Sequence, residues 1–63
     1  MRINYDVLRV ELARRDLNRR KMADMAGLSL STVYSITAGK RCSVETAQKI
    51  ADALGVTVDE IKE

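Results

Sequence analysis

Three glycines divide this chain into short segments, and their spacing restricts the possible folds more than any other feature. Gly27, Gly39 and Gly55 each follow a stretch with a helical pattern of apolar residues. A glycine ends a helix at little cost because it readily adopts the left-handed conformation that helix ends often need. The chain has no proline, and no stretch alternates for long enough to form a strand. The pattern predicts an all-α fold of short helices joined by tight turns.

Polar residues that favour helix N-termini indicate where five helices begin. The expected caps are Asn4, Asn18, Ser29, Ser43 and Thr57. We therefore expect helices over residues 5–16, 19–26, 30–38, 44–54 and 58–62. The last opens with Thr57-Val58-Asp59-Glu60, which has the form of a capping box.

Apolar residues at helical spacing predict which helix faces are buried. The residues expected to point inward from the first four helices are Val7, Leu8, Val10, Leu12 and Ala13; Met22, Ala23 and Met25; Val33 and Ile36; and Ala47, Ile50, Ala51 and Leu54. Phe and Trp are absent, so the core must be aliphatic. A chain of this length has room for one hydrophobic core, and we expect residues 1–63 to form a single domain.

Composition excludes several classes of function. The chain has no His and a single cysteine, Cys42, which argues against His-based catalysis and zinc binding within the chain. It also has no glycine-rich phosphate loop, so we expect no enzyme activity, no cofactor, no metal and no small-molecule substrate. The lone cysteine, expected to be a small apolar residue, favours a reducing compartment. Without a signal-peptide pattern or an apolar run of roughly 18 residues, we expect a cytoplasmic protein with no membrane contact.

The positive charges are concentrated in the first two thirds of the chain. Residues 1–41 contain nine Lys or Arg and four Asp or Glu, a net charge of +5, whereas residues 42–63 carry a net charge of −3. Such an asymmetry would orient the molecule in the field of a polyanion, although a solvated surface of mixed charge has the same composition.

The second and third predicted helices are separated only by Gly27-Leu28-Ser29. A three-residue turn that opens with glycine places one helix across the other, as in a helix-turn-helix unit. Ala23 is expected where the two helices approach most closely, and Leu28 and Val33 are expected to fill the wedge between them.

The stretch from Asn18 to Ile61 resembles the lambda-repressor-like helix-turn-helix family, which includes phage repressors, Cro-type proteins and Xre-type regulators. The matching motifs are Met22-Ala23, Gly27-Leu28-Ser29, Ser31-Thr32-Val33, Ile36, Gly39-Lys40-Arg41, Ala47, Ile50-Ala51, Ala53-Leu54-Gly55-Val56 and Val58-Asp59-Glu60-Ile61. The resemblance implies a compact five-helix DNA-binding domain whose helix over residues 30–38 enters the major groove.

The resemblance also implies the residues that contact DNA. Those expected to read bases are Leu30, Ser31, Thr32, Tyr34 and Ser35. Those expected to bind phosphates are Arg19, Arg20, Ser29, Lys40 and Arg41. Three roles stay open: Leu30 can contact a protein instead, Tyr34 can lie against the backbone, and Thr32 can support the helix start. Arg14-Arg15 forms a second basic cluster beside the first turn.

The sequence departs from the family at one pair of positions. Many members pair a Glu near the end of the third helix with an Arg in the first, and these positions here are Thr37 and Leu12. Losing both partners avoids the cost of an unpaired buried charge.

The resemblance implies a sequence-specific regulator of transcription that binds double-stranded DNA, of the phage or mobile-element repressor type. In solution we expect a monomer or a weak homodimer through Val56, Val58 and Ile61; the alternative is a dimer that forms only on DNA. Two alternatives are a protein-interaction module, such as an antirepressor or adaptor, and an antitoxin that acts with a partner.

Overall fold

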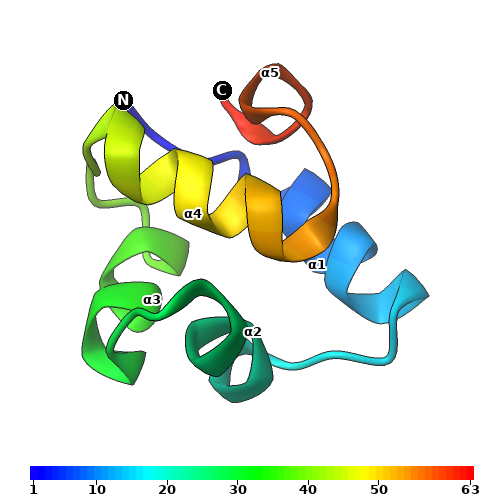
Figure 1. The fold of residues 1–63 in the computed structure, drawn as a ribbon. Coiled ribbons are helices and arrows are strands. Elements are labelled where there is room, and N and C mark those ends of the chain that lie inside the picture. The colour runs from blue at the N-terminus through cyan, green and yellow to red at the C-terminus, as the bar shows by residue number, and fades with distance from the viewer.

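In a computed structural model that describes residues 1–63, the chain forms five α-helices (Figure 1). They are α1 (Tyr5–Arg14), α2 (Arg19–Ala26), α3 (Leu30–Thr37), α4 (Val44–Leu54) and α5 (Val58–Ile61). The side chains of Asn4, Asn18, Ser29 and Ser43 accept a backbone N–H in the first turn of the helix that each precedes. The predicted all-helical fold and these four caps are confirmed.

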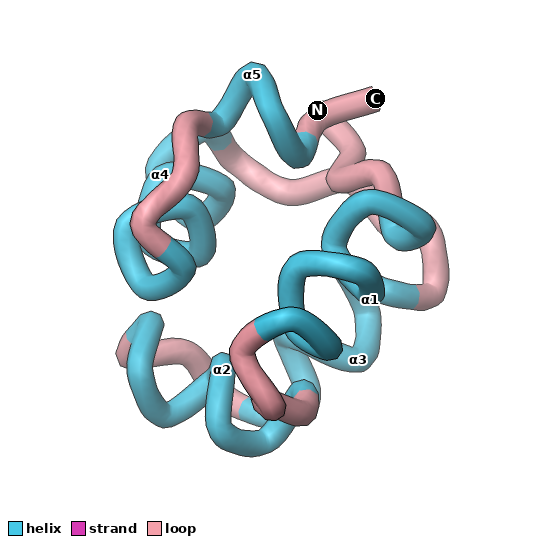
Figure 2. The backbone as a smooth tube through the Cα atoms, turned by 90° about the vertical axis from the view of Figure 1, so that its right-hand side faces the viewer, coloured by secondary structure: helices cyan, strands magenta, loops and turns pink.

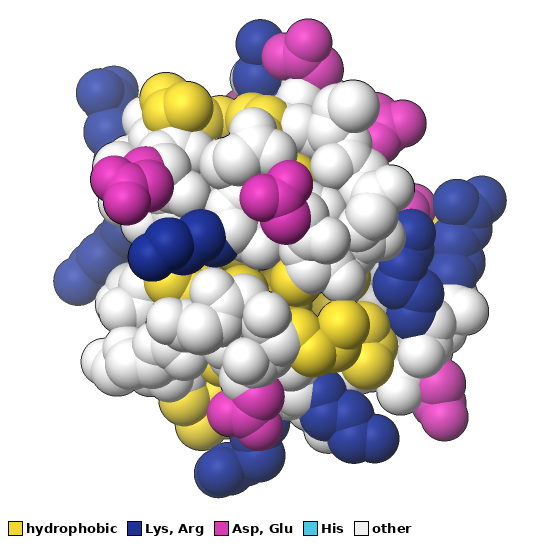
Figure 3. Space-filling view, viewed as in Figure 1, with side chains coloured by type: hydrophobic (Ala, Val, Ile, Leu, Met, Phe, Trp, Pro, Cys, Tyr) yellow, Lys and Arg dark blue, Asp and Glu magenta, His cyan; other side chains and the backbone are white.

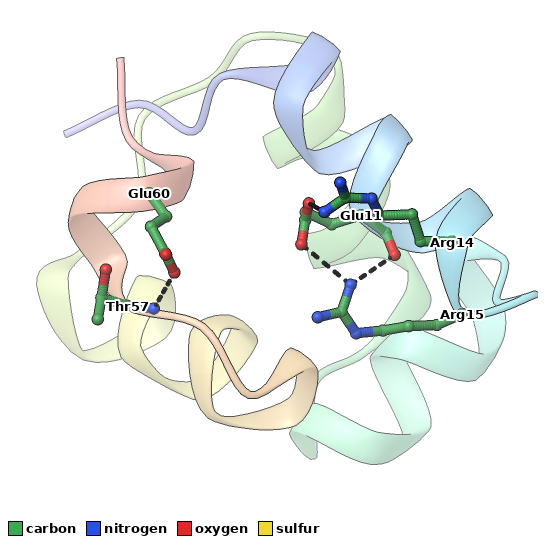
Figure 4. A network of polar contacts seen from close by, with 5 residues as sticks. All are labelled: Glu11, Arg14, Arg15, Thr57 and Glu60. Carbon is green, nitrogen blue, oxygen red and sulfur yellow. Dashed lines mark hydrogen bonds and ion pairs between the residues drawn. The ribbon is translucent and has the colours of Figure 1, made fainter.

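The N-terminus of α5 is capped by the side-chain carboxylate of Glu60. The backbone N–H of Thr57 donates to Oε2 of Glu60 at 2.7 Å, as the capping-box pattern predicts (Figure 4). This bond matters because α5 has only four residues, too few to persist without support from its surroundings.

Three helix ends differ from the prediction. The smallest difference is in α3, which is predicted to reach Ala38 but ends at Thr37, with Ala38 as its C-cap. The first helix was expected to reach Asp16 but ends at Arg14, because Asp16 adopts a left-handed conformation with φ of 54°. The N–H of Leu17 then bonds back to the carbonyl of Leu12 at 2.9 Å, which closes the helix end. The fifth helix ends at Ile61, because Lys62 is extended and pairs with Ile3.

The core consists of twelve buried residues, and all of them are apolar. They are Ile3, Leu8, Leu12, Met22, Ala23, Val33, Ile36, Ala47, Ile50, Ala51, Leu54 and Ile61. Helix α4 crosses the middle of the molecule, with α2 and α5 packed against it, α3 against α2, and α1 against α5 (Figure 1).

Three predicted core residues are exposed. Val10 is 49% exposed and Ala13 is also exposed, while Met25 is 54% exposed. At 100° per residue Val10 lies about 160–200° from the buried Leu8 and Leu12, on the opposite side of α1. Met25 points well away from the face of α2 that Met22 and Ala23 define, so α2 contributes a narrower apolar stripe than predicted.

The two ends of the chain lie side by side (Figures 1 and 2). Ile3 and Lys62 form an isolated antiparallel bridge, in which the N–H of Asn4 donates to the carbonyl of Ile61 at 2.7 Å. The N–H of Cys42 donates to the carbonyl of Met1 at 2.8 Å. Residues 1–4 therefore connect the C-terminal end to the loop that follows α3.

The position of Ile61 rules out part of the expected dimer surface. Its side chain is completely buried in the core of the monomer, where α5 packs on α1 and α4. Val56 and Val58 are partly buried against the same core. The prediction that Ile61 contributes to a dimer contact is wrong, because this side chain cannot reach a second copy while the core stays folded.

No helix combines the length and apolar character that crossing a membrane requires.

Candidate nucleic-acid interface

The corner between α2 and α3 is built from local backbone bonds around one glycine. Gly27 has φ of 69°, a conformation that suits glycine, and the N–H of Leu28 donates to the carbonyl of Ala23 at 2.9 Å. Ala23 is only 2% exposed and Val33 is fully buried, while Leu28 packs partly buried against the core. The predicted helix-turn-helix corner is confirmed, with a small residue where α2 meets its neighbours.

This corner leaves one face of α3 open. Val33 and Ile36 point into the core, and the opposite face carries a groove. The groove is lined by Leu30, Ser31, Tyr34, Ser35, Ala38 and Lys40. Four of the five residues predicted to read bases therefore lie together, and Ala38, which was not predicted to belong to the site, lies beside them.

The fifth predicted base reader has a local structural role. The hydroxyl of Ser29 donates to Oγ1 of Thr32 at 2.8 Å and accepts the backbone N–H of Thr32 at 3.1 Å. Both side chains thus stabilise the first turn of α3, and Thr32 does not line the groove. The N–H groups of Leu30 and Ser31 lie in the first turn, where no intrahelical acceptor exists, so they remain potential anion donors.

The end of α3 fixes where Lys40 lies. Gly39 has φ of 99°, and its N–H donates to the carbonyl of Ile36 at 3.1 Å. The N–H of Lys40 donates to the carbonyl of Ser35, also at 3.1 Å. These two bonds form the usual glycine-terminated helix end and hold the Lys40 backbone beside the groove.

The loop continues through Arg41 to Cys42. Arg41 is exposed, and burial raises the pKa of the Cys42 thiol above its ordinary value. At neutral pH this thiol stays protonated, which agrees with the predicted role as a small apolar residue.

The start of α2 carries Arg19, which contacts α3 directly. Its guanidinium lies over the ring of Tyr34, 4.7 Å from the ring centre, and its Nη1 donates to Oγ1 of Thr37 at 3.4 Å. Nothing in the spacing of these residues predicts the contact. Only the docking of α2 on α3 brings them together.

None of the basic residues predicted to bind phosphate has an acidic partner. The four ion pairs of the protein join Arg9 to Asp6, Arg14 and Arg15 to Glu11, and Lys62 to Asp59. Arg19, Arg20, Lys40 and Arg41 are in none of them. No carboxylate of the chain therefore neutralises their charges, which can act on an external anion.

The second basic cluster is different. Arg14 and Arg15 both donate to the carboxylate of Glu11, at 3.1 and 3.0 Å, and the Glu11 side chain is only 14% exposed (Figure 4). This shared carboxylate offsets part of the positive charge of the pair. In space-filling view, basic side chains lie around the left, right and lower edges of the molecule, and acidic side chains occur both over α4 and at several of the same edges (Figure 3).

Comparison with known proteins agrees with this geometry. The helix-turn-helix family model matches residues 8–61, which include α2, α3 and the turn between them. No curated protein matches the sequence closely enough to count as a relative. Because the match covers most of the chain, the protein belongs to the lambda-repressor-like helix-turn-helix family of DNA-binding regulators.

Proposed function

We propose that residues 1–63 form one unit that binds double-stranded DNA sequence-specifically and regulates transcription. The observation that carries this proposal is the groove on α3, whose lining includes Lys40 and whose Tyr34 is covered by Arg19. Neither cation has an acidic partner, so a reading face of hydroxyl and apolar side chains lies beside two positive charges that no carboxylate neutralises. That arrangement suits a helix that enters the major groove while its flanks contact phosphates.

Base reading would depend on short side chains. The hydroxyls of Ser31 and Ser35 can donate to or accept from base edges, and the methyl groups of Leu30 can contact the methyl of a thymine. The face carries no Asn, Gln or Arg side chain for bidentate base contacts. Sequence-dependent DNA shape therefore contributes part of the specificity in this proposal.

Phosphate binding would come from Arg19, Arg20, Lys40 and Arg41, with Ser29 and the first-turn amides of α2 and α3 as neutral donors. If each of the four cations neutralises one phosphate, the logarithm of the binding constant falls against the logarithm of salt concentration with a slope of about −3.6. We propose a cytoplasmic repressor of the phage or mobile-element type, without enzyme activity or cofactor.

Pairing of two copies would occur on DNA in this proposal. With Ile61 buried, only the partly exposed Val56 and Val58 remain of the expected dimer surface, which is too little for a stable apolar interface. Two copies would then occupy half-sites about 34–36 Å apart, one turn of the double helix.

One observation favours a second candidate, a protein-interaction module. Leu30, Tyr34 and Ala38 give the groove an apolar wall that can accept a protein side chain. The two candidates respond differently to salt. Phosphate binding weakens steeply as salt rises, whereas binding through an apolar wall does not.

Titration of isotope-labelled protein with a mixed-sequence duplex at low salt tests the proposal. We expect backbone amide shifts at Arg19, over residues 29–35 and at Lys40 and Arg41, with α5 unchanged. Lys40→Ala should weaken binding, whereas Lys49→Ala, which removes the same charge from α4, should leave it unchanged. No shift at millimolar DNA, or shifts confined to residues 56–61, would contradict DNA binding by α3.

A further inference from the structure

Arg19 and Tyr34 form a contact that the assignment of base readers and phosphate binders does not explain. The guanidinium of Arg19 lies 4.7 Å from the centre of the Tyr34 ring, well within the range of a cation–π interaction. Both residues are at the surface, and Tyr34 is 48% exposed. One face of a predicted base-reading ring is therefore already covered by a predicted phosphate ligand.

Thr37 fixes the same guanidinium from a second side. The hydroxyl of Thr37 donates its hydrogen to the carbonyl of Tyr34 at 3.1 Å, so its oxygen lone pairs are free to accept. Nη1 of Arg19 donates to this oxygen at 3.4 Å. Of the five N–H donors of a guanidinium, one is used by the protein, and the others have no acceptor within the chain.

We propose that Tyr34 is a positioning residue that holds Arg19 for a backbone phosphate, a role that rests on the proposed DNA binding. A free arginine side chain loses much rotamer freedom when it binds a phosphate. Stacking on the ring restricts that freedom before DNA arrives, while the unpaired N–H donors stay available for a phosphate oxygen. The ring thus acts on affinity through Arg19 rather than through a base.

This role differs measurably from base reading. A base reader, when replaced, changes the preference between DNA sequences. A residue that positions a phosphate ligand changes affinity by the same factor on every sequence, and its effect disappears once the ligand is removed. The interaction with an exposed ring is worth about a two- to fivefold change in the dissociation constant.

The test is a double-mutant cycle on two mixed-sequence duplexes of equal length and unrelated sequence, at low salt. We expect Tyr34→Leu to weaken binding about two- to fivefold on both duplexes, and Tyr34→Phe, which keeps the ring, to recover most of that loss on both. In the Arg19→Ala background, Tyr34→Leu should have no further effect. Two results would overturn the positioning role: a loss of affinity on only one of the duplexes, or an equally large effect of Tyr34→Leu when Arg19 is already replaced by Ala.

Two measurements distinguish a failure of the positioning role from a failure of the proposed DNA binding. The δ protons of Arg19 should show a ring-current shift that Tyr34→Leu abolishes and Tyr34→Phe keeps, which reports the contact without DNA. Amide spectra and thermal melts establish that each variant is folded, which the exposure of Tyr34 leads us to expect. If the unaltered protein binds neither duplex, the proposed function itself fails. If it binds but the losses add, only the positioning role fails.

Discussion

Replacement of Asp16 by glycine should stabilise the protein. Asp16 is exposed and is the only residue other than glycine with a positive φ, 54°, at the turn that follows α1. This turn leads directly to Asn18, the cap of α2, so its conformation sets the start of the helix that carries Arg19. Glycine occupies the equivalent position after α2, α3 and α4.

The expected gain follows from three contributions. A left-handed conformation costs an ordinary L-residue about 1–2 kcal/mol, and less for Asp, which tolerates it. A negative charge at a helix C-terminus costs about 0.3–1 kcal/mol, which the substitution removes. Glycine in turn loses about 0.5–1 kcal/mol through its greater freedom in the unfolded chain. The net increase in the free energy of unfolding is about 0.5–1 kcal/mol, or about 2–8 °C in Tm.

Urea denaturation at pH 7 measures this change, and two matched variants separate its causes. Asp16→Asn removes the charge but keeps a side chain that tolerates the left-handed region, so it should gain only the electrostatic part. Asp16→Ala removes the charge but not the strain, and should be no more stable than the unaltered protein. The expected order of stability is Gly, then Asn, then Ala. An alanine variant as stable as the glycine variant would show that position 16 does not hold a left-handed conformation.

Three further predictions concern the corner, the last helix and the groove. Ala23→Leu should lower the free energy of unfolding, measured in urea titrations, by about 1–3 kcal/mol, because Ala23 is buried where α2 meets its neighbours. The control Ala13→Leu, on the exposed side of α1, should change it by less than about 0.5 kcal/mol. Glu60→Ala should cost about 0.5–1.5 kcal/mol by removing the bond to the Thr57 N–H. It should cost more than Asp59→Ala, which removes the same first-turn charge and an exposed ion pair but no capping bond; equal losses would contradict the capping role. On a DNA site selected from random duplexes, replacing the thymines by deoxyuridine should weaken binding about fourfold for each thymine methyl group that Leu30 contacts. In Leu30→Ala, the thymine and deoxyuridine duplexes should bind equally well; an undiminished difference between them would exclude the contact.

Local chemistry explains why the helices could be predicted. A cap such as Asn18 or Ser29 acts on an amide three residues away, and Gly27 and Gly39 act on carbonyls within one turn, so these signals lie in short stretches of sequence. The end of α1 was misplaced because Asp16 takes a conformation usually reserved for glycine, and its identity does not reveal this. The exposed Val10 and Met25 show a related limit: an apolar residue indicates that burial is possible, whereas the packing of neighbouring helices decides which face is covered.

Contacts between distant segments could not be derived from spacing. The bridge between Ile3 and Lys62 is a single pair, too short to produce an alternating pattern, and it exists because α5 packs on α1. Similarly, the groove could be outlined from one face of α3, on which Ala38 follows Tyr34 by four residues, but Lys40 joins it only through the turn at Gly39. Ser29 and Thr32 do not line the groove because their hydroxyls bond to each other and the Ser29 hydroxyl also bonds to the Thr32 amide. Only the folded geometry determines these partners.

The contact of Arg19 with Tyr34 and Thr37 gives a physical meaning to the family departure at positions 12 and 37. Leu12 is buried in the core, and Thr37 accepts from Arg19 of α2 rather than from a residue of α1. The end of α3 thus contacts the start of α2. The two helices of the helix-turn-helix are therefore joined both by the turn at Gly27 and by the contact of Arg19 with Thr37. An ion pair buried between α1 and α3 would require two charges to be desolvated. An exposed arginine stacked on an exposed ring avoids that cost, and it keeps the charge at the surface where a phosphate can reach it.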